Sequence, residues 1–476
     1  MTAANEGGTW NALPYDEAFD ESGCHRPAYA ALARRLGWNP LCPPPAVVES
    51  LRGRPLGDDH QLLPVPLALA DEEYRYEIQR GVAQRARALQ MFFADVFLGE
   101  GRYLRSGTAL TASLLDEILS SVGATLEQLR KWWSGHGREA ICFVYGPDLV
   151  REPGGRWVVL EDNVGCVGGC ADSYYVLEAY KRATGLSPGA SFPPDLSRAV
   201  RLWLEGLRLA PGDPGVLAML SDGNALDAYL PARFEEDDRR IQLVQQLGIQ
   251  VMDDAEFERL CQGPELNSRL KVVVNIGVPS MRTWWLIRDV AFDQLHVPLL
   301  NSPGTILLGH KAFLPFVGEM ISFYCREDPI LQVPPTSLLR DGLLPTDLDN
   351  WVVKMATGCQ GTGVFILGSQ PLHRLDEIRS LIRDSWPARA AVAQRYVEPS
   401  RLRIGGPSGR TYLVELRAIA YVLGWQRVFS AEQSIGKLLR SGSRGGLNNT
   451  FCDGSYVPVI RESAADRSWV DERTLP

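Results

Sequence analysis

Long apolar runs are absent from this sequence. Its 476 residues include no stretch of about 18 uncharged apolar residues, which argues against a membrane-spanning helix. The opening residues, MTAANEGGTWNALPYDE, have neither the basic start nor the apolar run of a secretory signal, so we expect a cytoplasmic protein. A net charge of −8 offers no general basic surface, so we expect neither nucleic acid nor a membrane as partner.

Cysteine is too irregularly placed to form a disulfide framework. The nine cysteines are odd in number and show no repeating spacing, which fits a reducing compartment. Cys166 and Cys170 are the only close pair, and their nearest Cys or His neighbour in the chain is Cys142. This spacing disfavours zinc, and we interpret both as small buried thiols.

Lysine is scarce. Of 49 basic residues only six are lysines: Lys131, Lys181, Lys271, Lys311, Lys354 and Lys437. In a chain that uses arginine nearly everywhere else, a lysine inside an apolar strand needs a reason.

The length predicts two or three packed lobes. Residues 1–60 are expected on the surface apart from a helix near 28–36, and helical periodicity marks 71–99 and 111–133, the latter breaking at Gly123. Residues 185–213 are interpreted as a connector and 215–300 as a small parallel α/β unit, and the tail is expected to end in polar loops. We therefore divide the chain into segments 1–200, 201–300 and 301–476.

The run VVLEDNVG is the sharpest chemical signal. Alternate residues of a strand share a face, so Glu161 and Asn163 are predicted on one side and Asp162 on the other. Asp148 lies on the preceding strand, and the EPGG turn between them allows it to meet Glu161. Such carboxylate and amide oxygens suit Mg²⁺, although a charged strand end in solvent is the plainer alternative.

A second signal is WVVKMATGCQGTGVFI, where Lys354 interrupts an apolar strand ahead of Gly358, Gly361 and Gly363. Glycines allow backbone N–H groups to approach an anion, and the lysine adds a charge. The lysine precedes the glycines, so this is not a Walker A loop, and a β-hairpin with a glycine turn remains open.

Three weaker motifs complete the set. Lys311 opens a helix after NSPGT and is a candidate phosphate ligand, or simply solvated. Glu415 and Arg417 share a strand face, either as a structural ion pair or as neutralising charge near phosphates. An extended segment could pair with an adenine edge and reach a ribose through its glutamate: Gln394, Tyr396, Val397 and Glu398.

Together these motifs resemble the circularly permuted ATP-grasp family (type 2), which includes glutathionylspermidine-synthetase-like and uncharacterised bacterial members. The Asp and E-x-N block comes first and the lysines follow. The resemblance implies an ATP-grasp fold of α+β and α/β character, with its halves in permuted order beside a small parallel lobe on the substrate side. It also implies that ATP and Mg²⁺ are the cofactors.

The resemblance further assigns roles. Mg²⁺ would be held by Asp148, Glu161 and Asn163. Phosphates would be held by Lys311, Lys354 and the glycine loop, and Arg417 and Lys354 would act in catalysis.

The implied activity is a carboxylate–amine ligase that forms an acyl phosphate and releases ADP, acting on a small-molecule or peptide carboxylate and an amine. The stretch after Asn163, with Gly165 and Gly168, departs from many relatives, so substrate identity cannot be borrowed from them. A phosphotransferase and a non-catalytic ATP-binding module remain as alternatives.

Overall fold

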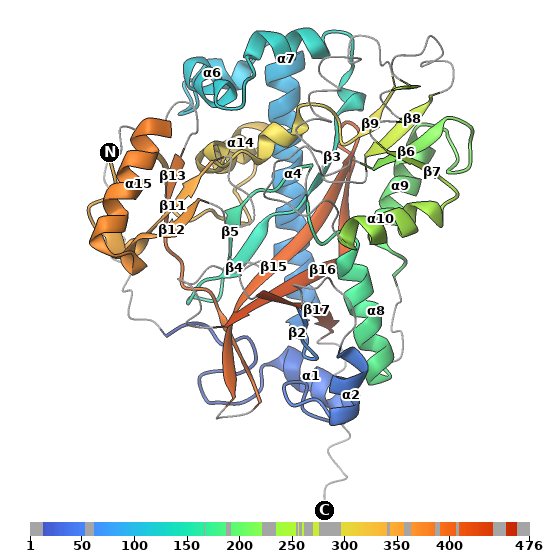
Figure 1. Ribbon diagram of the computed structural model, residues 1–476, viewed down its shortest axis with the longest axis vertical. Helices are drawn as coiled ribbons and strands as arrows, with labels where there is room; N and C mark the ends of the chain where they lie inside the picture. The colour runs from blue at the N-terminus through green and yellow to red at the C-terminus, as the bar shows by residue number, and fades with distance from the viewer. Residues whose placement is uncertain are drawn as a thin grey trace, which may run out of the picture.

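Three β-sheets and the helices packed on them make up the fold (Figure 1). The computed structural model describes these residues: 13–52, 61–165, 167–186, 192–220, 235–253, 256, 259–260, 270–275, 297–339, 343–356, 363–385, 391–405, 409–440 and 454–463.

The largest sheet has nine strands in the order β1-β17-β16-β15-β4-β5, with β2, β3 and β14 attached to this path. Its strands are β1 Gln61–Leu62, β2 Leu67–Ala70, β3 Cys142–Tyr145, β4 Asp148–Arg151, β5 Trp157–Glu161, β14 Arg401–Ile404, β15 Arg410–Leu423, β16 Val428–Arg440 and β17 Gly454–Glu462. The long central strand β15 is almost wholly buried, as expected for a run rich in β-branched and aromatic residues. The sheet therefore joins residues from both ends of the sequence.

One long helical segment packs across this sheet (Figure 1). It runs without interruption through α3 Asp71–Glu73, the π-turns Tyr74–Gln79, α4 Arg80–Phe93 and the π-turns Ala94–Leu98. Val82, Ala86, Leu89 and Phe93 are buried at three- and four-residue spacing, which gives the segment one apolar stripe. The predicted helix over 71–99 is thus confirmed.

Further helices surround this core. Their bounds are α1 Pro27–Leu36, α2 Pro45–Leu51, α5 Arg102–Arg105, α6 Ala112–Ser120, α7 Leu126–Trp133, α8 Asp172–Thr184 and α9 Asp195–Gly206, with 3-10 turns at Arg138–Ala140. A capping box formed by Thr125 and Gln128 starts α7 after the break near Gly123. The expected division of 111–133 into two helices is therefore confirmed.

The second sheet is parallel, in the order β7-β6-β8-β9. It consists of β6 Val216–Leu220, β7 Gln250–Asp253, β8 Val272–Asn275 and β9 Leu299–Leu300, with α10 Glu235–Gln245 packed beside it. The predicted small parallel unit is confirmed in this region.

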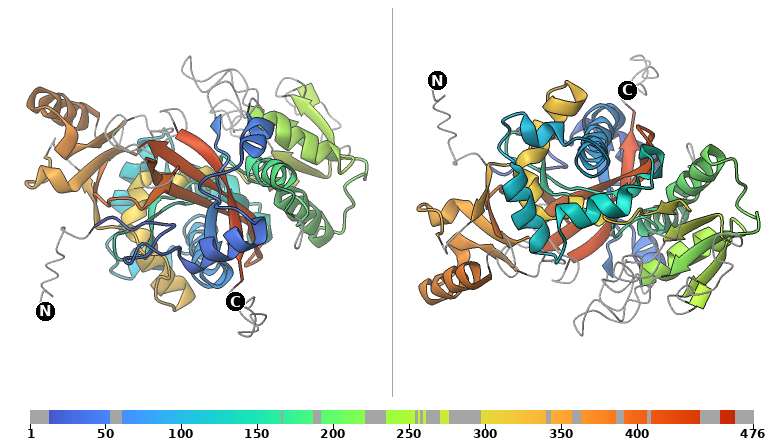
Figure 2. Two further views of the ribbon diagram at one scale, coloured as in Figure 1. Left: turned by 90° about the horizontal axis from the view of Figure 1, so that it is seen from below. Right: turned by 90° about the horizontal axis from the view of Figure 1, so that it is seen from above.

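The third sheet is antiparallel, in the order β10-β13-β11-β12. Its elements are β10 Thr336–Leu339, β11 Trp351–Met355, β12 Val364–Ile366, β13 Ala391–Arg395 and the covering helix α15 Leu372–Ser385, with 3-10 turns at Leu348–Asn350 and Leu367–Ser369. It is linked to the second sheet by 3-10 turns at Thr305–Gly309 and Lys311–Phe316, α14 Val317–Met320 and π-turns at Ile321–Cys325. Viewed end-on, the second and third sheets lie on opposite sides of the large sheet (Figure 2).

Two expectations from the sequence are wrong, and two strands were not predicted. The proposed connector 185–213 contains helix α9, whose apolar face packs on β15 and β16 although Pro and Gly flank it. The sequence indicated no strands after residue 423, yet β16 and β17 are buried sheet strands, while the predicted polar loops at the end of the tail lie outside the described residues. The first 60 residues hold a second helix, α2, which begins at a Pro–Pro pair.

No helix among the described residues is long and apolar enough to cross a membrane.

Candidate active site

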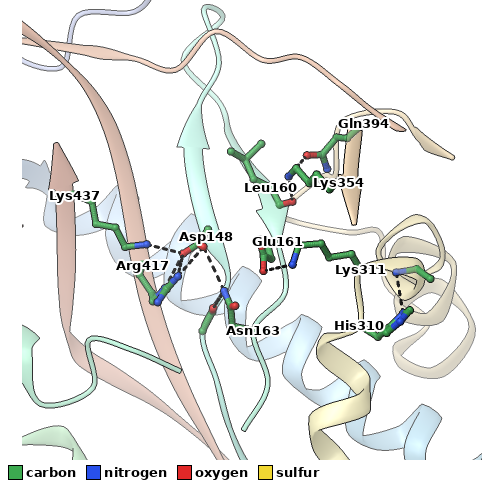
Figure 3. Close-up of polar contacts among 12 residues, drawn as sticks. Asp148, Leu160, Glu161, Asn163, His310, Lys311, Lys354, Gln394, Arg417 and Lys437 are labelled. Carbon is green, nitrogen blue, oxygen red and sulfur yellow. Dashed lines mark hydrogen bonds and ion pairs between the residues drawn. The ribbon is translucent and has the colours of Figure 1, made fainter. Parts of the chain in front are cut away.

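The candidate site lies where the large sheet approaches the third sheet. Lys354 of β11 donates from Nζ to the carbonyl of Leu160 on β5, at 2.8 Å, and so links the two sheets directly (Figure 3). Charged side chains converge on both sides of this link.

The β4–β5 hairpin brings the two predicted metal-binding carboxylates together. Asp148 stands opposite Glu161 in the strand register, with a register shift just beyond Asp148. The tight turn at Glu152–Gly155, where Gly155 has a φ of 86°, closes the hairpin. The meeting of Asp148 and Glu161 was predicted from the EPGG turn and is confirmed.

Asp148 is held by two cations from neighbouring strands. Arg417 of β15 donates to both of its carboxylate oxygens, from Nε and Nη2 at 2.7 Å each, and Lys437 Nζ of β16 lies 3.1 Å from Oδ1. Burial alone would raise the pKa of Asp148, but these cations outweigh it and hold the pKa below its usual range. Asp148 is therefore an ionised carboxylate.

Lys437 was not predicted to belong to the site. It is 7 % exposed and stands opposite Glu415 in the β15–β16 register, with its ammonium bonded to the Glu415 carboxylate. Burial raises the pKa of Glu415 to about 7 despite this contact. Glu415 and Arg417 do share a strand face, since both reach the same cluster.

Glu161 and Asp162 point to opposite sides of the strand end, as predicted. Glu161 forms an ion pair with Lys311 Nζ at 2.8 Å and remains partly exposed. Asp162 is buried and accepts from the Arg85 guanidinium of α4, at 2.7 and 3.1 Å, and from the Tyr145 hydroxyl at 2.5 Å. This buried network fixes the end of β5 and so orients Glu161.

Asn163 follows the strand and faces Asp148. Its amide nitrogen donates to the Gly146 carbonyl at 3.1 Å and lies 3.4 Å from Asp148 Oδ2. Beyond it, Val167 packs so tightly on Gly146 that a Cβ there would lie 2.4 Å from Val167 Cγ1. The Gly168 carbonyl accepts from Arg417, so the altered stretch after Asn163 adjoins the cluster.

Lys354 has neutral partners. Besides Leu160 it donates to Gln394 Oε1 at 2.7 Å, and Gln394 in turn bonds Thr336 of β10. Burial lowers the pKa of Lys354 to about 8, with Glu161 opposing and Lys311 reinforcing the shift. Two predicted residues, Lys354 and Gln394, are thus in direct contact.

His310 is a second residue that the sequence did not indicate. Its Nδ1 accepts from the Ala312 amide at 3.4 Å, and its Nε2 lies 3.1 Å from Ser121 Oγ, which itself donates to the Ile118 carbonyl. Burial and the neighbouring Lys311 charge lower the pKa of His310 to about 3, so the ring is neutral. The imidazole ties the start of the Lys311 segment to the end of α6.

The remaining predicted residues lie farther along the third sheet or outside the described part. Tyr396 donates from its hydroxyl to Glu398 at 2.8 Å, and Glu398 also pairs with Arg401 at 2.8 Å, with Val397 half-buried between them. Gly363 begins the return strand of the β11–β12 hairpin with a φ of 72°. Gly358 and Gly361 lie outside the described residues.

The donor set fits a hard divalent cation in part. Asp148, Glu161 and Asn163 supply two carboxylates and an amide on neighbouring strands, which are the ligand types Mg²⁺ takes alongside phosphate oxygens. Among the described residues no group of three or more Asp, Glu, His or Cys side chains could hold a metal. The described residues thus supply a partial set of oxygen ligands and not a closed metal cage.

Residues 66–274 match the model of a family described as circularly permuted ATP-grasp type 2. This part of the chain resembles circularly permuted ATP-grasp proteins. The matched range contains the β4–β5 hairpin with Asp148 and Glu161, whereas Lys311, Lys354 and Arg417 follow it in the sequence. The family resemblance is thereby confirmed.

Two similar proteins come from Frankia species. "Putative glutamate--cysteine ligase 2-3" of Frankia alni is 29 % identical over 402 residues, covering 77 % of this chain and 45 % of its own length. "Putative glutamate--cysteine ligase 2-2" of Frankia casuarinae is 28 % identical, covering 91 % of this chain and 53 % of its own. This chain spans about half the length of these relatives.

A solved structure shares the fold. A glutathione synthetase-like effector from Globodera pallida superposes with a TM-score of 0.51 at 13 % identity, over 83 % of this chain and 89 % of that one. At this identity the likeness shows the fold alone. The expected mixed α and β fold of ATP-grasp type is confirmed, while the segment boundaries 1–200, 201–300 and 301–476 stay a prediction.

Proposed function

We propose that the chain is an ATP-dependent carboxylate–amine ligase that forms an amide through an acyl phosphate and releases ADP and phosphate. The observation that supports this most is the convergence of Lys311 and Lys354 on the strand end that carries Glu161. Phosphate-binding cations and metal-binding carboxylates must lie together for phosphoryl transfer. The names of the Frankia relatives point to the same class of reaction.

In this proposal the third sheet binds the nucleotide. Lys354 and Lys311 bind the terminal phosphates, exchanging their present oxygen partners for phosphate oxygens. The backbone from Tyr396 to Glu398 pairs with the adenine edge, and Glu398 binds the ribose. Gln394 keeps the Lys354 ammonium at the strand end, since its other contact with Thr336 fixes its amide.

Asp148, Glu161 and Asn163 are the residues that would hold Mg²⁺. When bound, the metal neutralises phosphate charge during the transfer. Asp162 positions these residues indirectly, because its hydrogen bonds with Arg85 and Tyr145 hold the end of β5 in place.

Arg417 stands at the side of the cluster away from the nucleotide sheet (Figure 3). There its guanidinium would stabilise the phosphoryl group as a substrate carboxylate oxygen attacks the γ-phosphorus and the bond to ADP breaks. An amine then attacks the acyl carbon, phosphate leaves, and the proton lost by the amine passes to phosphate or solvent. The small parallel sheet would border the substrates.

Hydroxylamine provides the test because it traps an acyl phosphate as a hydroxamate. We expect hydroxamate and ADP in equal amounts when the chain is incubated with ATP, Mg²⁺, hydroxylamine and the correct carboxylate. L-Glutamate is the first carboxylate to try, given the names of the relatives, followed by other amino acids and dipeptides, with cysteine and polyamines as amines. AMP as the nucleotide product would contradict the proposal.

A kinase would release ADP without needing an amine and would give no hydroxamate. The ratio of hydroxamate to ADP therefore separates the ligase from a phosphotransferase. A chain that binds ADP but turns over no ATP with any of these substrates would be the non-catalytic module.

A further inference from the structure

Lys437 occupies a position at which a divalent cation would compete with it. Its ammonium lies 3.1 Å from Asp148 Oδ1 and also contacts Glu415. The lysine comes from the interior of β16, and its register with Glu415 is set by the sheet. The ammonium is therefore delivered by a rigid strand and not by a loop that could swing away.

The other proposed metal-binding carboxylate is also already paired. Glu161 bonds Lys311, and Asp148 bonds Arg417 as well as Lys437. A free metal ion would have to displace cations from both carboxylates before it gained either. Among the described residues no group of three or more Asp, Glu, His or Cys side chains is placed to hold a metal, so no further ligands offset that loss.

The balance of charge in the cluster favours the metal only together with nucleotide. Lys311, Lys354, Arg417 and Lys437 outnumber the carboxylates Asp148, Glu161 and Glu415 by one formal charge. A divalent cation alone adds two more positive charges to a buried cluster, which is unfavourable at low effective dielectric. The negative charges of a nucleoside triphosphate more than cancel that addition.

We propose that Lys437 is an internal counter-ion of Asp148 that excludes free divalent cations, so that the metal enters the site together with the nucleotide. This inference rests on the proposed nucleotide site and adds a positioning residue to it. If Asp148 binds a metal, the Lys437 ammonium still has Glu415 as a partner, so the charge of Lys437 is not left unpaired. Arg417 continues to direct the Asp148 side chain.

Titration of the whole chain with Mn²⁺, as a probe of the divalent site, tests the proposal without any turnover. In calorimetry without nucleotide we expect weak binding to the wild-type chain, and binding at least about tenfold tighter when ADP is present, a change of about 1.4 kcal/mol. Lys437→Met, which retains the length of the side chain, should bind Mn²⁺ without ADP at least about tenfold more tightly than wild type.

Two variants serve as controls. Lys437→Arg keeps the charge and should behave as wild type, and Lys131→Met removes a lysine from the exposed surface of α7 and should also leave Mn²⁺ binding unchanged. Lys437→Gln repeats the charge removal with a polar side chain in case the methionine variant fails to fold.

Equal Mn²⁺ affinity of wild type and the neutral variants would overturn the proposal. So would wild-type chain that binds Mn²⁺ as tightly without ADP as with it, an outcome that needs no variant. Failure of the wild type to bind ADP at all would instead contradict the proposed function, so the two failures are distinguishable.

Discussion

The two ends of the candidate site hold their cations in different ways. At the carboxylate end, defined by Asp148, Glu415, Arg417 and Lys437, each cation contacts a carboxylate. At the lysine end, defined by Lys354 and Gln394, the ammonium contacts only neutral oxygens among the partners that the structure shows. The pKa of Asp148 is accordingly lowered by its partners, whereas the pKa of Lys354 is lowered by burial.

This difference distinguishes charges that stabilise the fold from charges that we expect to bind a ligand. A buried ion pair is costly to break from one side because the remaining charge is stranded. A buried ammonium with neutral partners has instead given up hydration without gaining a counter-ion, so an incoming phosphate is favoured. We therefore expect the carboxylate end to govern stability and the lysine end to govern nucleotide binding.

The largest effect is expected from Arg417→Met. The change removes two hydrogen bonds from a largely buried carboxylate and should lower the free energy of unfolding by about 3 kcal/mol in urea denaturation. Arg156→Met is the matched control, since this arginine pairs with Glu152 at the surface and should cost less than about 1 kcal/mol. If Arg417→Met also lowered the free energy of unfolding by less than about 1 kcal/mol, the carboxylate end would not govern stability.

Lys354→Met should lower ATP turnover at least about a hundredfold, or about 2.7 kcal/mol, while leaving the fold intact. The aliphatic stem remains, and the loss of hydrogen bonds to Leu160 and Gln394 should cost only about 1–3 kcal/mol of stability. Lys181→Met, in a partly buried pair with Glu178 within α8 and outside the site, is the control and should keep wild-type turnover. A Lys354 variant that retains more than about a tenth of the activity would show that this lysine does not bind phosphate.

The pH dependence of ADP binding should come from the lysine end. The Lys354 ammonium, with a pKa of about 8, is protonated at pH 7 and mostly neutral at pH 9, so ADP affinity measured by calorimetry should fall up to about tenfold over this interval. Lys354→Arg keeps its charge and should flatten the profile. A wild-type affinity that does not change with pH would mean that the ammonium is not in the ADP site.

The smallest effect is expected from Glu415→Gln. Its folded pKa is raised to about 7 from an ordinary 4.5, so ionised Glu415 costs stability as pH rises through this window. The glutamine can still accept a hydrogen bond from Lys437, and Lys437 retains its ion pair with Asp148. At pH 8 the substitution should therefore raise the free energy of unfolding by less than about 1 kcal/mol. At pH 5 the increase in the free energy of unfolding over wild type should be smaller. If the variant were markedly less stable than wild type at pH 8, ionised Glu415 would instead stabilise the fold.

Local patterns sufficed to predict part of this site. A turn signal between two short apolar strands predicted that Asp148 meets Glu161, and strand alternation separated Glu161 from Asp162. Lys354 was found because a charge in an apolar strand is conspicuous. Each of these inferences needed only residues within about one hairpin of one another.

The residues that were missed depend on distant contacts. Lys437 was available to the same argument as Lys354, as one of six lysines, but no strand was predicted around it. His310 acquires its neutral state from burial against α6, nearly 200 residues earlier in the chain. Helix α9 was missed because its packing on β15 and β16, rather than its flanking Pro and Gly, determines its structure.

The nine-stranded sheet has a consequence for synthesis on the ribosome. Asp148 and Glu161 emerge early, but the strands that carry Arg417 and Lys437 follow more than 250 residues later, and β17 then pairs in parallel with β1 and β2. Until then the nascent chain presents unpaired strand edges, and the Asp148 carboxylate lacks its cationic partners. Pairings of such high sequence separation form slowly. The cluster of Asp148, Arg417 and Lys437 therefore comes together among the last steps of folding, after β17 has cleared the exit tunnel.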